Sequence, residues 1–334
     1  MKLKILFLTQ GGETLPSVRF RVLPFIHIWK NQGIDVSYFK LPKTLIKKIP
    51  FYFKLPKADV IILQKKLVSK SELFLIKTKA KKICFDFDDA VWTSHPSVKL
   101  TLKIKKKNFK NRTRLLNIVK NADLVICGNQ YLCSNIWDFT PNTLILPTSI
   151  DIDKYCPTLQ EKTEKKNFVV GWIGTNSNIF FMKNIFESIK KIEGIQIKVV
   201  SNKNLNVNLP RGVIFEIWDA NREVEQIRSF NIGLMPLLDD EYTRGKCGFK
   251  IIQYMSCGVV PIASDVGFNR DIISHGQDGF LVKKEHEWIK YIQMLREDVS
   301  LQKKMSTNAR KKIEKNFNIK NSASILLRKI QSLL

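Results

Sequence analysis

The sequence lacks the long hydrophobic runs that would place it in a membrane. No stretch approaches the ~20 consecutive apolar residues of a membrane span. The apolar run near the N-terminus, residues 5–8, is shorter than the core of a signal peptide. We therefore expect a cytoplasmic protein that is either soluble or peripheral at the inner membrane face.

Cysteine and histidine occur too sparsely to build a metal site or a disulfide scaffold. The six cysteines form no CxxC pair, and the four histidines form no cluster beside them. Several cysteines lie in apolar runs, where a thiol packs as a small hydrophobic group. We therefore expect reduced thiols, no bound metal and no cofactor apart from the substrate.

Acidic residues are scarce in the first half of the chain. Residues 1–150 hold 27 Lys and Arg against 9 Asp and Glu, a net charge of +18 out of +26 for the whole chain. This excess favours contact with an anionic surface, either lipid headgroups or nucleic acid, unless the lysines are simply solvated. If residues 98–120 are helical, they form a basic amphipathic helix of the kind that lies on anionic bilayers. Residues 41–57 show neither a helical nor a strand period. We expect them to form either a segment that packs against the domain or a lobe that touches a membrane.

Strand and helix patterns alternate along nearly the whole chain. Apolar runs predict strands at 4–9, 34–39, 60–63, 82–87, 123–127, 143–146, 168–173, 195–200, 213–217, 232–235 and 259–263. Helical spacing predicts helices at 18–31, 69–79, 131–137, 223–230, 250–255, 270–274 and 285–295, one that opens from the polar turn 174–178 and runs to 191, and two more in 301–334. The fold class is therefore α/β, with two Rossmann-like domains whose parallel sheets face across a cleft. We expect domains at 1–150 and 167–315, a linker at 151–166, and a helix at 316–334 that packs back toward the first domain.

Residues 245–267 contain a glycine turn, a helix and a buried strand. Gly245 and Gly248 mark a close approach of the backbone, and Arg244, Lys246 and Lys250 place three cations beside it. Helix N-termini bind anions in such turns, so a phosphate is the expected ligand. The alternative is a packed turn with solvated lysines.

The chain resembles the family 4 type glycosyltransferases of the GT-B fold. The resembling segments, in order, are SVRFRVLPFIHIWKNQGIDV, ICFDFDDAVW, ADLVICGNQYL, LILPTSIDIDKYCP, VVGWIGTNSN, RGKCGFKIIQYMSCGVVPIAS and VGFNRDIISHGQDGFLV. The resemblance implies a retaining, metal-independent transfer. The donor, a UDP- or GDP-sugar, is bound mainly by the second domain, and the acceptor, a glycan or a lipid-linked glycan of cell-surface polysaccharide synthesis, is bound mainly by the first.

The donor site expected from this resemblance lies around the 245–267 stretch. Lys246 and Lys250 are predicted to stabilise the charge of the leaving diphosphate. The residues predicted to contact the donor are Gly174, Thr175, Asn176, Arg244, Gly248, Phe249 and Gln253. Family members usually carry two glutamates that are replaced here by Gly245 and Gln253. Sugar recognition is therefore unassigned, with Asp239, Asp240 and Glu241 as substitutes.

The acceptor side is expected at the carboxyl ends of the first domain's strands. Asp88 is predicted to be catalytic, because it takes the place of the histidine that faces the donor sugar in many relatives. It would bind an acceptor hydroxyl or support an oxocarbenium-like transition state. The other acceptor-side residues are Gly11, Gly12, Arg19, Arg21, Asp86, Asp89 and His95. Arg19 and Arg21 would meet an acceptor phosphate or lie on a solvated helix face, and Asp86 and Asp89 would otherwise cap the following turn.

Two other functions stay open from the sequence. A GT-B nucleotide-sugar epimerase would need acidic residues around the sugar, and Gly245 weakens that case. A non-catalytic membrane or nucleic-acid binder would use the basic charge alone. No nucleic acid is expected, because the basic residues are not interleaved with a known DNA or RNA module.

Overall fold

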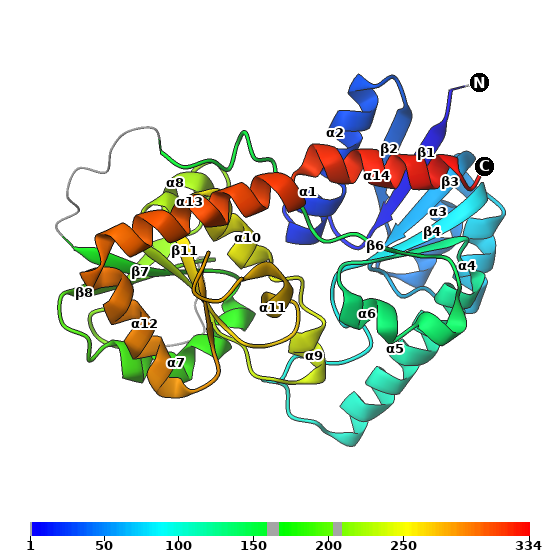
Figure 1. The fold of residues 1–334 in the computed structure, drawn as a ribbon. Coiled ribbons are helices and arrows are strands. Elements are labelled where there is room, and N and C mark those ends of the chain that lie inside the picture. The colour runs from blue at the N-terminus through cyan, green and yellow to red at the C-terminus, as the bar shows by residue number, and fades with distance from the viewer. Residues whose placement is uncertain (1, 159–166, 203–208) are drawn as a thin grey trace. The chain divides into compact units, whose positions relative to one another are not determined.

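The chain folds into two compact units in the computed structural model, which describes residues 2–158, 167–202 and 209–334. Unit 1 contains the chain up to Ser149 together with Asp240–Cys247 and Ile319–Leu334. Unit 2 contains the described residues of Ile150–Asp239 and Gly248–Asn318. Each unit is built on a six-stranded parallel sheet (Figure 1). The predicted α/β class is therefore confirmed.

The sheet of unit 1 has the strand order β2-β1-β3-β4-β5-β6. Its strands are β1 (Lys4–Thr9), β2 (Asp35–Lys40), β3 (Ala58–Gln64), β4 (Ala80–Phe87), β5 (Leu124–Cys127) and β6 (Thr143–Ile145). The central strands are buried on both faces, as parallel sheets require. The strand order reverses between β1 and β3, so their carboxyl ends form the topological switch point, where ligands bind in such sheets.

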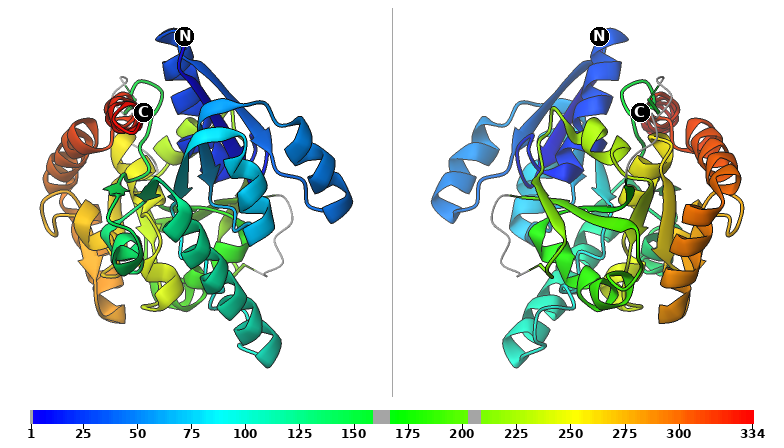
Figure 2. Two further views of the ribbon diagram at one scale, coloured as in Figure 1. Left: turned by 90° about the vertical axis from the view of Figure 1, so that its right-hand side faces the viewer. Right: turned by 90° about the vertical axis from the view of Figure 1, so that its left-hand side faces the viewer.

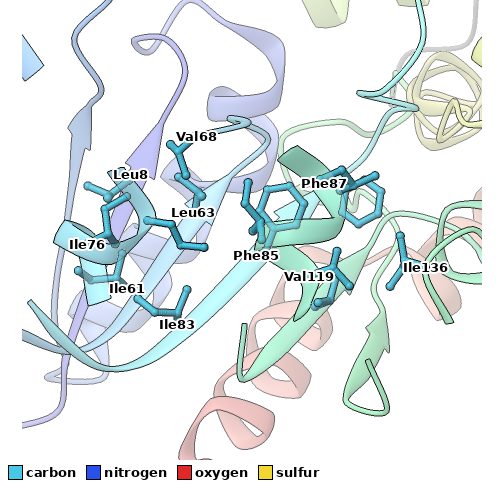
Figure 3. Packing of buried hydrophobic residues seen from close by; sticks show 14 of the residues in the cluster. Leu8, Ile61, Leu63, Val68, Ile76, Ile83, Phe85, Phe87, Val119 and Ile136 are labelled. Carbon is cyan, nitrogen blue, oxygen red and sulfur yellow. The ribbon is translucent and has the colours of Figure 1, made fainter. Parts of the chain in front are cut away.

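Helices cover both faces of this sheet. On one face lie α1 (Pro16–Arg21), α2 (Leu23–Asn31) and α14 (Ile319–Gln331), and the Trp29 indole donates to the Ala323 carbonyl at 3.1 Å. On the other face lie α3 (Leu45–Lys54), α4 (Lys70–Lys77), α5 (Leu102–Asn121) and α6 (Gln130–Ser134). Their shared core includes the stacked rings of Phe85 and Phe87 (Figure 3). The short elements η1 (Trp137–Phe139) and α9 (Glu241–Arg244) complete the unit.

The sheet of unit 2 has the strand order β12-β11-β10-β7-β8-β9. Its strands are β7 (Phe168–Ile173), β8 (Ile195–Ser201), β9 (Ile214–Ile217), β10 (Ile232–Met235), β11 (Val260–Ser264) and β12 (Phe280–Val282). Its helices are η2 (Asn176–Met182), α7 (Lys183–Ile189), α8 (Glu223–Arg228), α10 (Phe249–Ser256), α11 (Asn269–Ile272), α12 (Glu285–Glu297) and α13 (Val299–Asn316). The switch point of this sheet lies between β7 and β10.

The structure differs from the sequence expectation in several elements. The predicted helix 18–31 is interrupted at Val22, where φ is −125°. Residues 41–57 contain the helix α3, whose period is obscured by Pro50, which has no backbone N–H to donate. The helix predicted to follow the polar turn 174–178 begins inside that turn, as the 3-10 helix η2. Part of the predicted linker, 159–166, lies outside the described residues. Its described part, which includes Ile152 and Tyr155, belongs to unit 2, where Arg310 donates to the carbonyls of these two residues.

Membrane-spanning helices were not expected. Among the residues that the structure describes, no helix combines the length and the apolar content that a bilayer span requires.

Candidate functional site

A lysine forms ion pairs with the carboxylates at the carboxyl end of β4. Lys65, directly after β3, places Nζ 3.1 Å from Asp88 Oδ1 and forms a second ion pair with Asp89. Its backbone N–H donates to the Asp86 carbonyl at 2.7 Å. Lys65 has a φ of 60°, the one positive value among the described non-glycine residues. Such strain is tolerated where the surroundings fix the backbone, and it clusters at functional sites.

The charges in this cluster keep Asp88 ionised. Burial alone would raise the pKa of Asp88, but the charges of Lys65 and Arg21 outweigh it and lower that pKa. Burial would lower the pKa of Lys65, and Asp88 and Asp89 reverse the direction and raise it. Burial also lowers the pKa of Lys246. Burial and the charge of Asp89 together raise the pKa of Tyr242 to about 12. At neutral pH, Asp88 is therefore a carboxylate that can accept a hydrogen bond from a hydroxyl group.

Arg21 and Asp86 differ from their predicted roles. Arg21 is buried, and its Nε donates to Asp86 Oδ2 at 3.1 Å while Nη2 donates to Oδ1. Nη1 donates to the Leu146 carbonyl at 2.9 Å and to Thr148 Oγ1 at 3.1 Å. Burial opposes the charge of Arg21, but Asp86 outweighs it and raises the pKa of Arg21. The guanidinium therefore lies neither on a solvated helix face nor where an acceptor phosphate would reach it, and Asp86 is its counterion.

The segment Asp240–Cys247 packs onto the carboxyl end of β4 within unit 1. Cys247 Sγ donates to the Asp88 carbonyl at 3.1 Å, and Asn129 Nδ2 donates to the Lys246 carbonyl at 3.0 Å. The ammonium group of Lys246 lies 4.7 Å from the ring centroid of Tyr242. Lys246 is therefore held beside the acceptor-side carboxylates Asp88 and Asp89.

Two of the acidic residues expected to replace the family's glutamate have structural partners. Asp240 Oδ1 accepts from the Thr243 N–H at 2.8 Å and caps α9, and Glu241 accepts from the indole of Trp92. At Gly245 itself, an added Cβ would lie 2.6 Å from the Cβ of Ala90. A side chain cannot be accommodated there without moving the backbone, so glycine is required by the close approach.

The remaining acceptor-side residues lie around the turn after β1 and the loop after β4. Gly11 accepts from Thr9 Oγ1 at 2.8 Å, and an added Cβ at Gly12 would meet nothing within 4 Å. The guanidinium of Arg19 lies 4.4 Å from the ring centroid of Phe20. The His95 ring contacts Tyr242 edge-on, with centroids 5.1 Å apart, so His95 and Lys246 both lie against the Tyr242 ring.

In unit 2, the turn after β7 meets Lys250. An added Cβ at Gly174 would lie 2.7 Å from the Trp172 ring and 2.8 Å from Lys250 Cε. The Lys250 ammonium lies 5.6 Å from the Trp172 ring centroid. Ser201 Oγ is within hydrogen-bond distance of the Gly174 carbonyl, at 2.7 Å, and of Asn176 Oδ1, at 3.0 Å. The structure thus brings together Gly174, which is predicted to contact the donor, and Lys250, which is predicted to stabilise the leaving diphosphate.

The N-terminus of α10 has the features of an anion site. Gly248 precedes the helix with a φ of 58°, and an added Cβ would lie 2.3 Å from Ile272 Cδ1. The half-buried Phe249 begins the helix, and the first turn has a lysine, Lys250, and no acidic residue. This helix N-terminus therefore offers an anion both the positive end of the helix dipole and an ammonium group.

The other predicted donor residues take varied positions. Thr175 precedes η2, and its Oγ1 accepts from Asn178 Nδ2 at 2.9 Å. Gln253 is buried on α10, one turn after Phe249. Arg244 is exposed at the end of α9. Arg244 and Lys246 belong to unit 1 and Lys250 to unit 2, although the sequence assigns all three to one domain.

Sequence reasoning missed Lys65 and Asn129. Lys65 follows a buried strand directly, which is the same signal that identified Asp88, but it is one of many lysines. Asn129 follows β5 in the same way, and it joins Asp240–Cys247 to the sheet of unit 1. Within the described parts of the chain, no group of three or more His, Cys, Asp or Glu is arranged to hold a metal ion.

Comparisons with known proteins bear on the family and on the fold. Residues 234–312 match the family described as Glycosyl transferases group 1. A comparison with curated protein sequences finds no match. Sucrose-phosphate synthase from Thermosynechococcus elongatus is 13% identical over 99% of both chains, with a TM-score of 0.81.

Two further solved structures are similar over nearly their whole length. HepE from Anabaena, in complex with UDP and glucose, is 16% identical over 99% of this chain and 100% of that chain, with a TM-score of 0.74. An α-glucosyltransferase in complex with UDP and a 13-mer DNA containing a HMU base is 14% identical, with the same coverage and a TM-score of 0.68. These likenesses confirm the predicted GT-B fold. Together with the family match, they support the predicted glycosyltransferase.

Proposed function

We propose that the protein transfers a sugar from a UDP- or GDP-sugar to a glycan or lipid-linked acceptor. The observation that carries this proposal is the N-terminus of α10, where Gly248 precedes the helix and Lys250 packs against the turn at Gly174. This helix lies within the residues that match the glycosyl transferase family. The positive end of its helix dipole and the ammonium of Lys250 suit a diphosphate.

The chemistry follows from the charge that develops on the leaving group. When the sugar departs, the nucleoside diphosphate gains negative charge, and preorganised dipoles and cations stabilise it in the transition state. Lys250 and the α10 N-terminus supply that stabilisation, with Lys246 as a second proposed cation. We propose transfer without a resident metal, and with retention of configuration as the resemblance of the motifs implies. Thr175, Asn176, Arg244, Phe249 and Gln253 remain proposed donor contacts.

Asp88 is the proposed catalytic carboxylate of unit 1. Because Lys65 holds it ionised, it can accept a hydrogen bond from the acceptor hydroxyl or stabilise positive charge on the sugar ring. Gly11, Gly12, Arg19 and His95 are proposed to lie along the acceptor, with Asp89 helping to orient Lys65. The proposed setting is cell-surface polysaccharide synthesis at the cytoplasmic face of a membrane, in keeping with the charge of +18 in residues 1–150.

Nucleotide binding tests the proposal most directly. Thermal shift and isothermal titration with UDP, GDP and a panel of their sugars should identify one nucleotide that stabilises the protein. The expected gain is about 2.7 kcal/mol at a hundredfold excess over Kd. Absence of affinity for every nucleoside diphosphate would overturn the proposal. Mass spectrometry of the donor incubated without acceptor separates a transferase from an epimerase, since only the epimerase turns over efficiently alone.

A further inference from the structure

Three neighbouring helices of unit 1 expose large apolar side chains on the face turned away from the sheet. Helices α3, α4 and α5 cover the same face of the sheet, as the left-hand view of Figure 2 shows. Their exposed apolar residues, with exposed fractions, are Ile46 86%, Ile49 58%, Phe53 68%, Phe74 68%, Leu102 78% and Phe109 76%. We call this set the outer apolar face. Binding of a partner that removes these side chains from water would be favourable.

The arrangement on α5 separates two faces of one helix. Leu115, Ile118 and Val119 are buried against the sheet. Leu102 and Phe109 are seven residues apart and therefore share the opposite face. The core of unit 1 thus does not account for them.

Helices α3 and α4 repeat this arrangement. Ile46, Ile49 and Phe53 are spaced by three and four residues along one side of α3, while Tyr52 on another side is buried. Phe74 is exposed on α4, while its neighbour Leu73 is buried. Each helix therefore uses one side for the core and presents apolar side chains on another.

Lysines surround these apolar side chains. On α5, Lys103, Lys106 and Lys110 flank Leu102 and Phe109, and residues 98–121 contain no acidic residue. On α4, Lys70 and Lys77 lie one turn to either side of Phe74, and on α3, Lys47 and Lys54 accompany the isoleucines. The surface therefore combines apolar side chains with a dense positive charge.

We propose that the outer apolar face docks onto an anionic lipid bilayer. Lipid satisfies both components, because headgroup phosphates pair with the lysines while Ile46, Leu102 and Phe109 enter the acyl boundary. A nucleic acid would use the lysines and could stack on the phenylalanines, but its phosphate backbone offers nothing to the aliphatic side chains. This proposal deepens the membrane location proposed above by naming the surface that provides it.

Vesicle sedimentation of the full chain tests the surface. Vesicles of phosphatidylcholine alone are compared with vesicles containing about one-third phosphatidylglycerol, because anionic lipid supplies the surface potential. We expect binding to the anionic vesicles only, weakening as salt is raised. The double variant Leu102→Ser/Phe109→Ser should bind at least about tenfold more weakly, because two apolar side chains no longer enter the bilayer.

Matched variants distinguish the contribution of the outer apolar face to vesicle binding from the general effect of removing exposed apolar side chains. Ile217→Ser/Val299→Ser removes two exposed apolar residues of unit 2 and should leave vesicle binding unchanged. Lys103→Gln/Lys106→Gln/Lys110→Gln should reduce binding at low salt and flatten the salt dependence. All of these residues are exposed, so unchanged melting temperatures are expected.

Two outcomes would overturn the proposal. One is equal vesicle binding by the wild type and by Leu102→Ser/Phe109→Ser. The other is tight, salt-dependent binding to duplex DNA or RNA with none to anionic vesicles, which would assign the lysines to nucleic acid. The assay contains no nucleotide sugar, so a negative result here leaves the donor-binding test of the proposed transferase intact.

Discussion

Lys250 is the single side chain on which the proposed donor site depends most. Its side chain packs against Gly174 at the start of α10, where the proposed diphosphate would meet both an ammonium group and the helix dipole. Lys250→Ala should reduce turnover by about 10²–10³-fold, the usual loss for one preorganised charge donor. The measurement is the initial rate with the nucleotide sugar identified by thermal shift. Lys290→Ala, on α12 of the same unit, is the control and should keep full activity; an active Lys250→Ala would remove the phosphate assignment.

Lys65 offers a test of the ionised state of Asp88. In Lys65→Asn the ammonium is lost, while asparagine tolerates the left-handed backbone that Lys65 adopts. The pKa of Asp88 should rise, because burial is then less opposed. Activity that needs the carboxylate should therefore be lost at a higher pH as the medium is acidified.

The pH profile of the rate is the readout for Lys65→Asn. Lys66→Asn changes the neighbouring lysine and should leave the acid limb of the profile in place. An acid limb that does not move in Lys65→Asn would mean that the rate does not depend on ionised Asp88.

Gly245 tests whether the missing glutamate can be restored. Gly245→Glu should destabilise unit 1 by about 1–3 kcal/mol or more, because the new Cβ overlaps Ala90. Urea denaturation measures the loss. Gly12→Glu introduces the same side chain where a Cβ meets nothing within 4 Å, and its stability should stay near the wild-type value. Equal stability of the two variants would contradict the close approach at Gly245.

At this scale the sequence indicates residue types and misses their partners. Asp88 is identifiable because it directly follows a buried strand. Gly174 is identifiable for the same reason, since it directly follows the buried strand β7. The pairing of Arg21 with Asp86 joins residues 65 positions apart and depends on how α1 lies over β4. Nothing in the local pattern distinguishes a buried arginine of that kind from a solvated one.

At the scale of elements, α4 shows how one carboxylate can fix a helix and its neighbour. Ser69 and Glu72 form a capping box, and Glu72 also accepts from the Tyr52 hydroxyl of α3 at 3.2 Å. Burial would raise the pKa of Glu72, but Lys48 and Ser69 outweigh it and lower that pKa to about 2. The capping box therefore ties α4 to α3 through one ionised group.

Glu72→Gln should remove a pH-dependent part of the stability. Because the folded pKa lies below the unfolded one, the contribution is present above about pH 4.5 and is lost between about pH 4.5 and 2. Allowing for solvent screening, the loss at neutral pH should be about 1–2 kcal/mol. Urea midpoints measured across this pH range give the result. The exposed Glu13→Gln is the control, and a parallel pH dependence in wild type and Glu72→Gln would contradict the assignment.

Element prediction succeeds where one periodicity dominates. The strands β1, β7 and β10 occur with the predicted bounds, because each is a short apolar run between polar turns. Helix α3 is missed because Pro50 and the aromatic residues hide its period, and the three-residue β12 is too short to give a pattern.

At the scale of the whole molecule, unit 1 is assembled from separate stretches of chain. Helix α14 belongs to it and buries Ile319, Ala323, Leu326 and Ile330 against the same core as Trp29. In Figure 1 this helix is the red element near the blue α2. The alternation of strands and helices identifies two sheets, but only contacts reveal that Asp240–Cys247 groups with the first one.

Removal of residues 319–334 should abolish cooperative unfolding of unit 1. Each buried isoleucine or leucine contributes about 1.5–3 kcal/mol, so the total loss is comparable to the 5–15 kcal/mol, roughly, that stabilise a domain. Circular dichroism melting and binding of a hydrophobic dye measure the change. Removal of the exposed Leu334 alone is the control. A shortened chain with a native melting transition would show that α14 is dispensable.

The late position of α14 has a consequence for synthesis of the protein. Domains usually fold in order as they leave the ribosome, yet the part of the sheet face that α14 covers, beside α1 and α2, stays open until residue 331 has been translated. A nascent chain of this protein therefore leaves part of this core uncovered until α14 has emerged, and its yield in cells should depend on chaperones that shield that surface during elongation.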